Sequence, residues 1–436
     1  MQKLEKKEEN IELLESLASH LLEEGRIEKG YMPASSRYER YNLCWIRDLI
    51  VTASALYNYS SYEGSSRGRE ARRKADEMVS FAESVAMHYK KNLEKGINSS
   101  IDDPYGAVHR LKGYLPARVG EDGFMSKEDY EAFIDGRGEW LKQYDTLPWI
   151  AYGLYQKSAK SKLDAKDIYF LSNFSSLCFE SMLKHFKLPC FNAWETEGDY
   201  IHAYDVIAAA AGISIIKKFA EEGLARGMED YAERRIEEFY KNGPMGFLRD
   251  FFVRNNMIYP RKHMSIHVTE PDMQQSTNLE LNVAICYFLV AEWELNPEAN
   301  RIIGKEIAIN TLDKTYEERF RGRILGTRFK GDTYFKGGSW IFGSGEYYIA
   351  RLQIKGDGMR ELEAFLGKIR QIGNPLPEQT LDFTESEEDP EGYLESNHGK
   401  PVEELAMSYA TAINAAVELL KRRDGIKASK NSIEMT

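Results

Sequence analysis

The sequence has few cysteines and no long apolar run. Its four cysteines, Cys44, Cys178, Cys190 and Cys286, show no CxxC spacing, which argues against a disulfide framework and is typical of reduced, buried thiols. No stretch approaches the roughly 18 apolar residues of a membrane span. The N-terminal stretch MQKLEKKEENIELL predicts a charged helix, not a signal peptide. We therefore expect a cytoplasmic protein that has no membrane partner.

Basic residues are in the minority. The chain has 58 Lys and Arg against 69 Asp and Glu, which gives a formal net charge of −11. This balance argues against nucleic acid as a partner, because phosphate backbones are bound by clustered basic side chains. The closest histidine pair, His263 and His267 in KHMSIH, has no further convincing ligands nearby. We therefore expect no metal and no other cofactor.

The motifs of several large enzyme classes are also missing. The sequence contains no GxGxxG after a strand, no GxxxxGK[ST] and no GxSxG. It also lacks the alternating order of strands and helices that builds a parallel sheet. These absences argue against a dinucleotide-binding enzyme, a P-loop enzyme and a serine hydrolase of the nucleophile-elbow type.

Helical periodicity, in contrast, runs from one end of the chain to the other. Apolar residues recur at a spacing near 3.6, as in Ile207, Ala208, Ala211 and Ile215. The pattern predicts twelve helices, near residues 4–25, 46–60, 69–94, 139–158, 165–187, 200–221, 226–241, 278–293, 297–317, 343–355, 357–371 and 401–423. Strand-like alternation is confined to short stretches such as GRILGTRFKGDTYF.

Six long connectors separate these helices, at residues 26–45, 95–138, 188–199, 242–277, 318–342 and 374–400. They contain Trp, Tyr and Arg, so we expect them to be ordered and functional. Each connector follows an odd-numbered helix. In a ring of helix hairpins, every second connection emerges on the same face, so we expect these loops to converge at one end of an all-α ring.

Two connectors carry tryptophan next to charged side chains. In YNLCWIRDLI, Trp45, Arg47 and Asp48 precede an apolar helix, and the Arg and Asp could grip sugar hydroxyls through charge-assisted hydrogen bonds. In CFNAWETEGDY, Glu195 directly follows Trp194. The acids of this second stretch could also do no more than complement the positive end of the following helix.

Three further stretches add candidate residues. TRFKGDTYFKGGSWIFG contains Arg328 and Trp340 around a Gly-Gly pair, where the backbone can approach a ligand and the indole can stack on a sugar ring. In GNPLPEQTLDF, Glu378 follows a proline that restricts the backbone. EWLKQYDTLPW contributes Gln143 and Asp145.

In this order and on these connectors, the stretches resemble the catalytic domain of glycoside hydrolase family 15, the glucoamylases. The resemblance covers about residues 30 to 420. It implies an (α/α)6 barrel of six outer and six inner helices, with the active site formed by long loops at one end. This number of helices agrees with the twelve predicted from periodicity. We expect one catalytic domain over residues 1–425, followed by a polar tail at 426–436.

The resemblance also implies roles for individual residues. Glu195 corresponds to the general acid and Glu378 to the general base of the family. The predicted sugar-binding residues are Trp45, Arg47, Asp48, Gln143, Asp145, Trp194, Arg328 and Trp340. Inverting hydrolysis needs one protonated and one ionised carboxyl, about 6.5–9.5 Å apart. We therefore expect Glu195 to stay protonated, helped by the charges of Glu197 and Asp199, and Glu378 to stay ionised.

Some positions depart from the family pattern. Thr196 stands where many members have a second Glu, and Ser408-Tyr409-Ala410 stands where Ser-His-Ala is common. A further sugar-binding arginine has no clear counterpart, and Arg261 is a candidate for it. The function implied is an inverting, exo-acting α-glucosidase that releases β-glucose from maltooligosaccharides or glycogen fragments. An α,α-trehalase, an α-1,6-glucosidase and a non-enzymatic regulatory relative remain alternatives, and the oligomeric state stays open.

Overall fold

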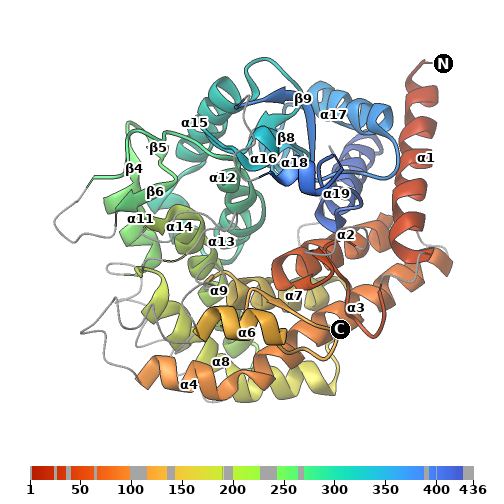
Figure 1. Cartoon of the computed structure of the whole chain (residues 1–436). Coiled ribbons are helices and arrows are strands. Elements are labelled where there is room, and N and C mark those ends of the chain that lie inside the picture. The colour runs from red at the N-terminus through yellow and green to blue at the C-terminus, as the bar shows by residue number, and fades with distance from the viewer. Residues whose placement is uncertain are drawn as a thin grey trace.

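Helices make up most of the part of the chain that the computed structural model describes, namely residues 2–23, 27–35, 41–62, 66–98, 115–134, 143–188, 190, 200–225, 243–263, 270–386, 392–398 and 400–425. The fold is an (α/α)6 barrel, as the sequence predicts. Figure 1 looks along the barrel axis and shows one ring of helices around the centre, with other helices outside it. None of the described helices is both long and apolar enough to span a bilayer.

The inner ring is built from helices that are buried over most of their surface, and the most apolar of them shows the pattern of a helix buried all round. In α9 (Ala203–Glu221), for example, nearly every residue up to Phe219 is buried. The other members are α2 (Ile46–Tyr62), α7 (Thr146–Lys160), a continuous helix made of α12 (Leu279–Val283), the π-helical η3 (Ala284–Leu289) and α13 (Val290–Leu295), α16 (Ser344–Lys355), and α19 (Ala406–Arg423). Each packs against the next, and α19 packs against α2 to close the ring.

Amphipathic helices cover the outside of this ring. The described outer helices are α1 (Gln2–Glu23), α3 (Ser66–His88), α8 (Ala165–His185), α15 (Lys305–Thr315) and α17 (Met359–Ile372). In α17 the buried residues Leu362, Phe365, Leu366 and Ile369 form one stripe, as a helix with one core-facing side requires. The predicted helix at 226–241 lies outside the described residues.

The periodicity misplaced several helix boundaries. The predicted helix 69–94 is divided into α3 and α4 (Lys90–Asn98), and 297–317 is divided into α14 (Pro297–Ile302), α15 and the π-helical η4 (Tyr316–Phe320). Three predicted connectors also contain separate α-helices, namely α6 (Lys127–Ile134), α11 (Pro244–Phe252) and the single-turn α18 (Tyr393–Ser396). The start of α11 has a physical signal that the periodicity overlooked, because Pro244 occupies the first helical position, where proline is favoured.

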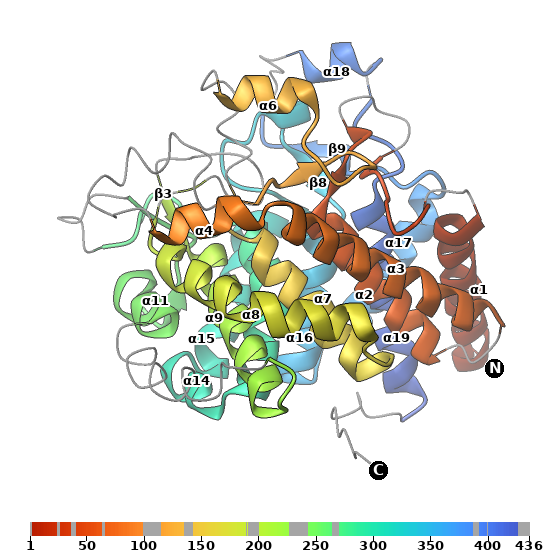
Figure 2. The ribbon, with the colours of Figure 1, turned by 90° about the horizontal axis from the view of Figure 1, so that it is seen from below.

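Short antiparallel strands tie the connectors together. The pairs are β1 (Cys44–Trp45) with β2 (Arg118–Val119), β3 (Tyr200–His202) with β6 (Arg261–His263), and β4 (Val253–Arg254) with β5 (Met257–Ile258). A three-stranded sheet has the order β7 (Gly326–Thr327), β8 (Gly338–Trp340) and β9 (Gln379–Thr384). Figure 2 shows β8, β9, α6 and the short α18 (Tyr393–Ser396) together at one end of the barrel.

The closure of the ring joins the two ends of the chain. The outer helix α1 packs on α19, and α19 packs on α2. The Asn58 amide donates a hydrogen bond to the Asn414 side chain at 2.9 Å, across a separation of 356 residues. Near the site end, the backbone N–H of Ala406 donates to the carbonyl of Ala34 at 2.9 Å. N-terminal and C-terminal segments therefore complete the same wall of the barrel.

We predict that Gly345→Ala destabilises the barrel. A Cβ atom at Gly345 would lie 2.0 Å from Thr411 Cγ2 and 2.8 Å from Phe365 Cζ, so α16 and α19 would have to separate. Overpacking of this kind costs about 1–3 kcal/mol. Gly367→Ala in α17 is the matched control, because nothing lies within 4 Å of its Cβ. Urea unfolding should give a lower midpoint for Gly345→Ala alone, and equal midpoints would contradict the close packing of these helices.

Candidate active site

A first cluster of buried polar side chains lies at the beginnings of α2 and α7. Arg47 Nε is 3.4 Å from Asp48 Oδ1. Arg47 Nη1 is 3.4 Å from both Gln143 Oε1 and Asp145 Oδ2. All four side chains are at most 6% exposed. The structure therefore brings together four of the predicted sugar-binding residues, which come from the beginnings of two helices about a hundred residues apart.

The next inner helix fixes the orientation of Asp145. The Tyr204 hydroxyl of α9 donates to Asp145 Oδ2 at 2.8 Å, and Trp149 Nε1 donates to the same hydroxyl at 2.8 Å. Burial raises the pKa of Tyr204 well above its ordinary value, and the charge of Asp145 raises it further. Tyr204 consequently stays protonated and acts as a donor to the carboxylate.

A second cluster surrounds Arg328. Its guanidinium makes two hydrogen bonds with the carboxylate of Asp332, at 2.9 and 2.7 Å. The same guanidinium lies 4.9 Å from the Trp340 ring and 5.1 Å from the Tyr334 ring. These are cation–π distances, and they hold the Trp340 indole, which is 2% exposed, in a fixed position.

Glu378 lies beside this second cluster at the beginning of β9. Its backbone is fixed from both sides, because Glu378 N–H donates to Val402 at 2.7 Å and its carbonyl accepts from Ile341 at 3.2 Å. The side chain is 3% exposed. Oε1 accepts a hydrogen bond from the Tyr41 hydroxyl at 3.4 Å. Among the described residues, Oε2 has no hydrogen-bond partner.

The surroundings of Glu378 shift the pKa of its carboxyl. Burial raises the pKa of Glu378 to about 8, and the charge of Asp48 adds to this effect. The Arg328 charge and hydrogen bonds from Tyr334 and Tyr41 act in the opposite direction. Burial thus opposes the ionised state expected for Glu378 from the sequence, and that state stays a prediction. The physical reason is that complete removal from water disfavours the charged form.

Tyr41, which no sequence motif singles out, joins the Arg328 cluster to Trp45. Its ring lies 5.4 Å from the Trp45 ring, and its hydroxyl contacts both Glu378 and the Tyr334 hydroxyl. Trp45 in turn lies under the Arg118 guanidinium at 4.9 Å. Tyr41 therefore contacts Glu378 through its hydroxyl and Trp45 through its ring. The sequence signal for Tyr41 is its position four residues before Trp45 in the same connector.

The segment that carries Trp194, Glu195, Glu197 and Asp199 lies outside the described residues, but both of its flanks are described. The backbone N–H of Cys190 donates to the carbonyl of Tyr200 at 3.3 Å. The Cys190 thiol donates to Asp205 Oδ2, also at 3.3 Å. The two flanks therefore meet at the beginning of α9, which is also the helix that supplies Tyr204.

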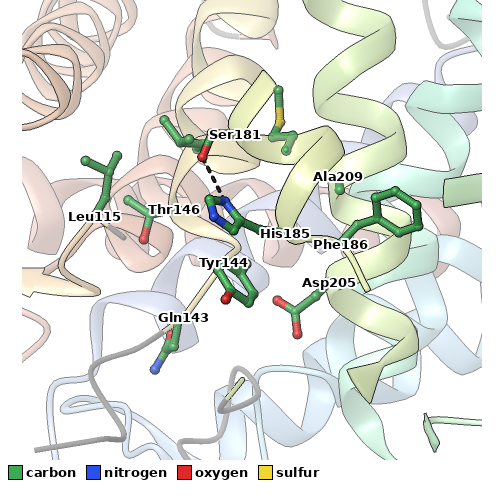
Figure 3. Close-up of a pocket in the computed structure, with 11 residues that line it drawn as sticks. Leu115, Gln143, Tyr144, Thr146, Ser181, His185, Phe186, Asp205 and Ala209 are labelled. Carbon is green, nitrogen blue, oxygen red and sulfur yellow. Dashed lines mark hydrogen bonds between the residues drawn. The ribbon is translucent and has the colours of Figure 1, made fainter. Parts of the chain in front are cut away.

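Asp205 is a further buried acid of this region that the sequence analysis missed. It is 3% exposed, and burial raises its pKa well above the ordinary value, with Asp145 and Glu280 adding like charge. Figure 3 shows the Asp205 carboxyl and the Gln143 amide among the side chains that line a small pocket. The rings of Tyr144 and His185 also line this pocket and stack at 5.0 Å. The sequence signal for Asp205 is its position as an acid in the first turn of an apolar helix, a position that Asp48 also has.

Arg261, the candidate for an additional sugar-binding arginine, forms an ion pair. Its Nε and Nη2 lie 2.8 and 2.7 Å from Asp272 Oδ2, and its guanidinium is 4.3 Å from the Tyr200 ring. Among the described residues, no group of three or more His, Cys, Asp and Glu side chains is arranged to hold a metal ion. His267 and the side chain of His263 lie outside the described part.

Comparison with known proteins gives one family. The family model described as "Glycosyl hydrolases family 15" matches residues 10–435. No curated protein sequence matches the chain.

Solved structures give the same fold. The structure named "Glycosidase Wild Type" has 17% identity and a TM-score of 0.71, and the match covers 93% of this chain and 97% of that one. A second structure, a glycosidase variant in complex with glucose, has 16% identity, a TM-score of 0.71 and the same coverage. The glucoamylase from Saccharomycopsis fibuligera has 13% identity and a TM-score of 0.58, with 96% of both chains covered. Identities this low show a shared fold.

Proposed function

The chain belongs to glycosyl hydrolase family 15, and within this family of glycoside hydrolases we propose that it is an exo-acting, inverting α-glucosidase of the glucoamylase type. It would release β-glucose from the non-reducing ends of maltooligosaccharides or of glycogen and starch fragments. The observation that carries this proposal is the placement of Glu378. Its buried carboxyl contacts the hydroxyl of Tyr41, whose ring lies beside Trp45, and the charge of Asp48 acts on it.

In this proposal Glu378 is the general base. An inverting hydrolase needs a carboxylate that accepts a proton from the attacking water. Oε2 has no hydrogen-bond partner among the described residues, so it can accept that bond, while Tyr41 and the Arg328 charge hold the other side of the carboxyl. The proton leaves the water as its oxygen bonds to the anomeric carbon.

Glu195 is the proposed general acid. It protonates the departing glycosidic oxygen while the bond from that oxygen to the anomeric carbon breaks. Glu195 is five residues from both Cys190 and Tyr200, the flanks that meet at the beginning of α9. Five extended residues span at most about 16–18 Å, which is the upper limit on the distance of Glu195 from either flank.

The remaining residues would bind the sugar. A terminal glucose presents hydroxyls around its edge, and the Arg47, Asp48, Gln143 and Asp145 side chains supply donors and acceptors for them. Trp45, Trp194 and Trp340 would supply flat apolar walls. Arg328 is held by Asp332 and would act mainly through its charge. We propose that residues 1–425 form this single catalytic unit.

A panel of α-linked disaccharides tests the proposed reaction. With maltose, isomaltose and trehalose as substrates, we expect the fastest turnover on maltose. Proton NMR in the first minutes should show the anomeric signal of β-glucose before mutarotation, since a water attacking from the opposite side inverts the configuration. First-formed α-glucose would contradict the inverting mechanism. Turnover of trehalose or isomaltose without maltose would contradict the proposed linkage.

The pH dependence of kcat/KM should report the raised pKa of Glu378. A general base works only when deprotonated, so kcat/KM should fall as pH decreases below about 8. Tyr41→Phe removes a hydrogen bond that favours the ionised form, so its acid limb should move to higher pH. Tyr130→Phe on α6 is the control, since this tyrosine is 49% exposed. If the acid limb of Tyr41→Phe stays at the wild-type pH, the limb does not report the ionisation of Glu378.

A further inference from the structure

A cavity of about 150 Å³ lies inside the inner ring, in the half of the barrel away from Glu378. Its lining includes Asn58 of α2, Lys160 of α7, Glu294 of α13, Gln353 of α16 and Lys421 of α19. Lys160 is the last residue of α7, whose N-cap is Asp145. Fifteen helical residues at 1.5 Å each put this lumen cavity about 22 Å along the axis from the first cluster.

The acidic side chains of the lumen cavity already have partners within the protein. Glu346 accepts from Tyr287 at 2.9 Å and from Thr411 at 2.6 Å, Glu294 accepts from Tyr155 at 3.3 Å, and Glu418 accepts from Arg422 at 3.1 Å. Asn58 and Asn414 bond to each other. Each of these three carboxylates therefore has at least one donor within the protein.

The other polar groups of the lining include two lysines and two glutamines, all of which carry N–H donors. Among the described residues, Lys160 and Lys421 make no hydrogen bond and no ion pair within 4.0 Å, and neither of the amides of Gln156 and Gln353 has a hydrogen-bond partner. Gln156 and Lys160 are one helical turn apart and so share a face of α7. Lys421 and Gln353 approach from α19 and α16. Three helices thus direct N–H groups into one space.

The two lysines repel each other. Burial lowers the pKa of Lys421 to about 8, and the Lys160 charge lowers it further while Glu418 opposes this. The pKa of Lys160 is also lowered, by burial and by Arg72, against Glu294. Lysines in a last turn commonly offset the negative end of the helix. Lysines directed outward could offset the helix end equally well. This role therefore does not explain why two ammonium groups lie inside one cavity.

We propose that the lumen cavity binds a phosphate-type oxyanion, held between Lys160 and Lys421 with the amides of Gln156 and Gln353 as further donors. Compact ammonium groups bind phosphate as point charges. A single water needs about 10–15 Å³ on the same volume measure, so an ion of several heavy atoms fits in the cavity. The proposal concerns a site separate from the catalytic one and does not depend on the glucosidase assignment.

Calorimetric titration of the full-length protein with inorganic phosphate and, separately, with glucose 6-phosphate tests this site. Chloride at matched ionic strength corrects for charge screening. We expect saturable phosphate binding that weakens at least tenfold in Lys160→Met and in Lys421→Met. Binding of both ligands indicates a site for the free ion, and preference for the ester indicates a sugar phosphate. Either supports the site.

Lys218→Met is the matched control, because Lys218 lies near the end of α9 and pairs with Glu222, and it should bind phosphate as the wild type does. Thermal unfolding of each variant checks that it is folded, and a folded Lys421→Gln variant replaces Lys421→Met if the latter is not. Hydrolysis of maltose should be unchanged in all of them. A wild-type protein that binds neither ligand, or lysine variants that bind normally, would overturn the proposal.

Discussion

Glu378→Gln is expected to lower kcat on maltooligosaccharides by at least about a hundredfold, because proton transfer by a positioned base contributes roughly 10²–10⁴. The amide keeps the shape of the carboxyl and can still accept from Tyr41, but it cannot take a proton from water. KM should change little, since the sugar contacts proposed for Arg47 and Asp48 stay in place. Steady-state kinetics on maltotriose, with the exposed Glu121→Gln as control, measures the effect.

A loss of stability would not explain this result. The pKa of Glu378 is raised in the folded protein, from 4.5 to about 8. The folded state therefore binds the extra proton between these values, and this group's contribution to stability falls as pH rises through that window. Neutral Gln removes the unfavourable ionised form, so the variant should unfold no earlier than the wild type at pH 8 and above. Normal turnover in a folded Glu378→Gln would remove this residue from the mechanism.

Glu195→Gln is expected to lower turnover of maltose by a similar factor, but for a different chemical reason. The variant cannot protonate the departing sugar oxygen, which is a poor leaving group. Fluoride leaves with much less assistance, so α-glucosyl fluoride should be hydrolysed far better than maltose by Glu195→Gln. Glu378→Gln should be slow on both substrates, because each still needs an activated water. Comparing the two variants on the two substrates assigns acid and base separately.

Two controls sharpen the assignment of the acid. Glu197→Gln, two residues further along, tests whether a neighbouring carboxyl does this work, and it should keep most of the maltose activity. Asp199→Asn tests the same point closer to α9. If Glu197→Gln or Asp199→Asn shows the selective loss on maltose and Glu195→Gln does not, the proposed acid is the wrong residue of this segment.

The fold could be predicted because its signal is local. An inner helix such as α9 is apolar on all sides and an outer helix such as α17 has one apolar stripe, and both patterns are visible in any window of about fifteen residues. The spacing of long connectors then indicated a ring. α6 and α11 were missed because they are only eight and nine residues long and lie in stretches whose aromatic content suggested ordered loops.

The candidate site was predictable only in part, because its geometry depends on contacts between distant segments. Arg47, Asp48 and Glu378 stand in motifs that can be read directly. Tyr41 has no such motif, and its importance comes from contacting a carboxyl 337 residues later. The raised pKa of Glu378 was equally hidden, because it depends on how completely other connectors remove the side chain from water.

The way the ring closes has a consequence for how this protein is made. During synthesis, α1 and α2 leave the ribosome several hundred residues before α19, the helix against which both of them pack. Contacts of such high sequence separation form slowly, and in the meantime the apolar flank of α2 has no permanent cover. Nascent chains are then prone to aggregate. A polypeptide released before α19 is made would leave α1 and α2 uncovered where α19 packs on them. Slow translation should therefore increase aggregation of this barrel more than that of a protein whose packed helices are adjacent in sequence.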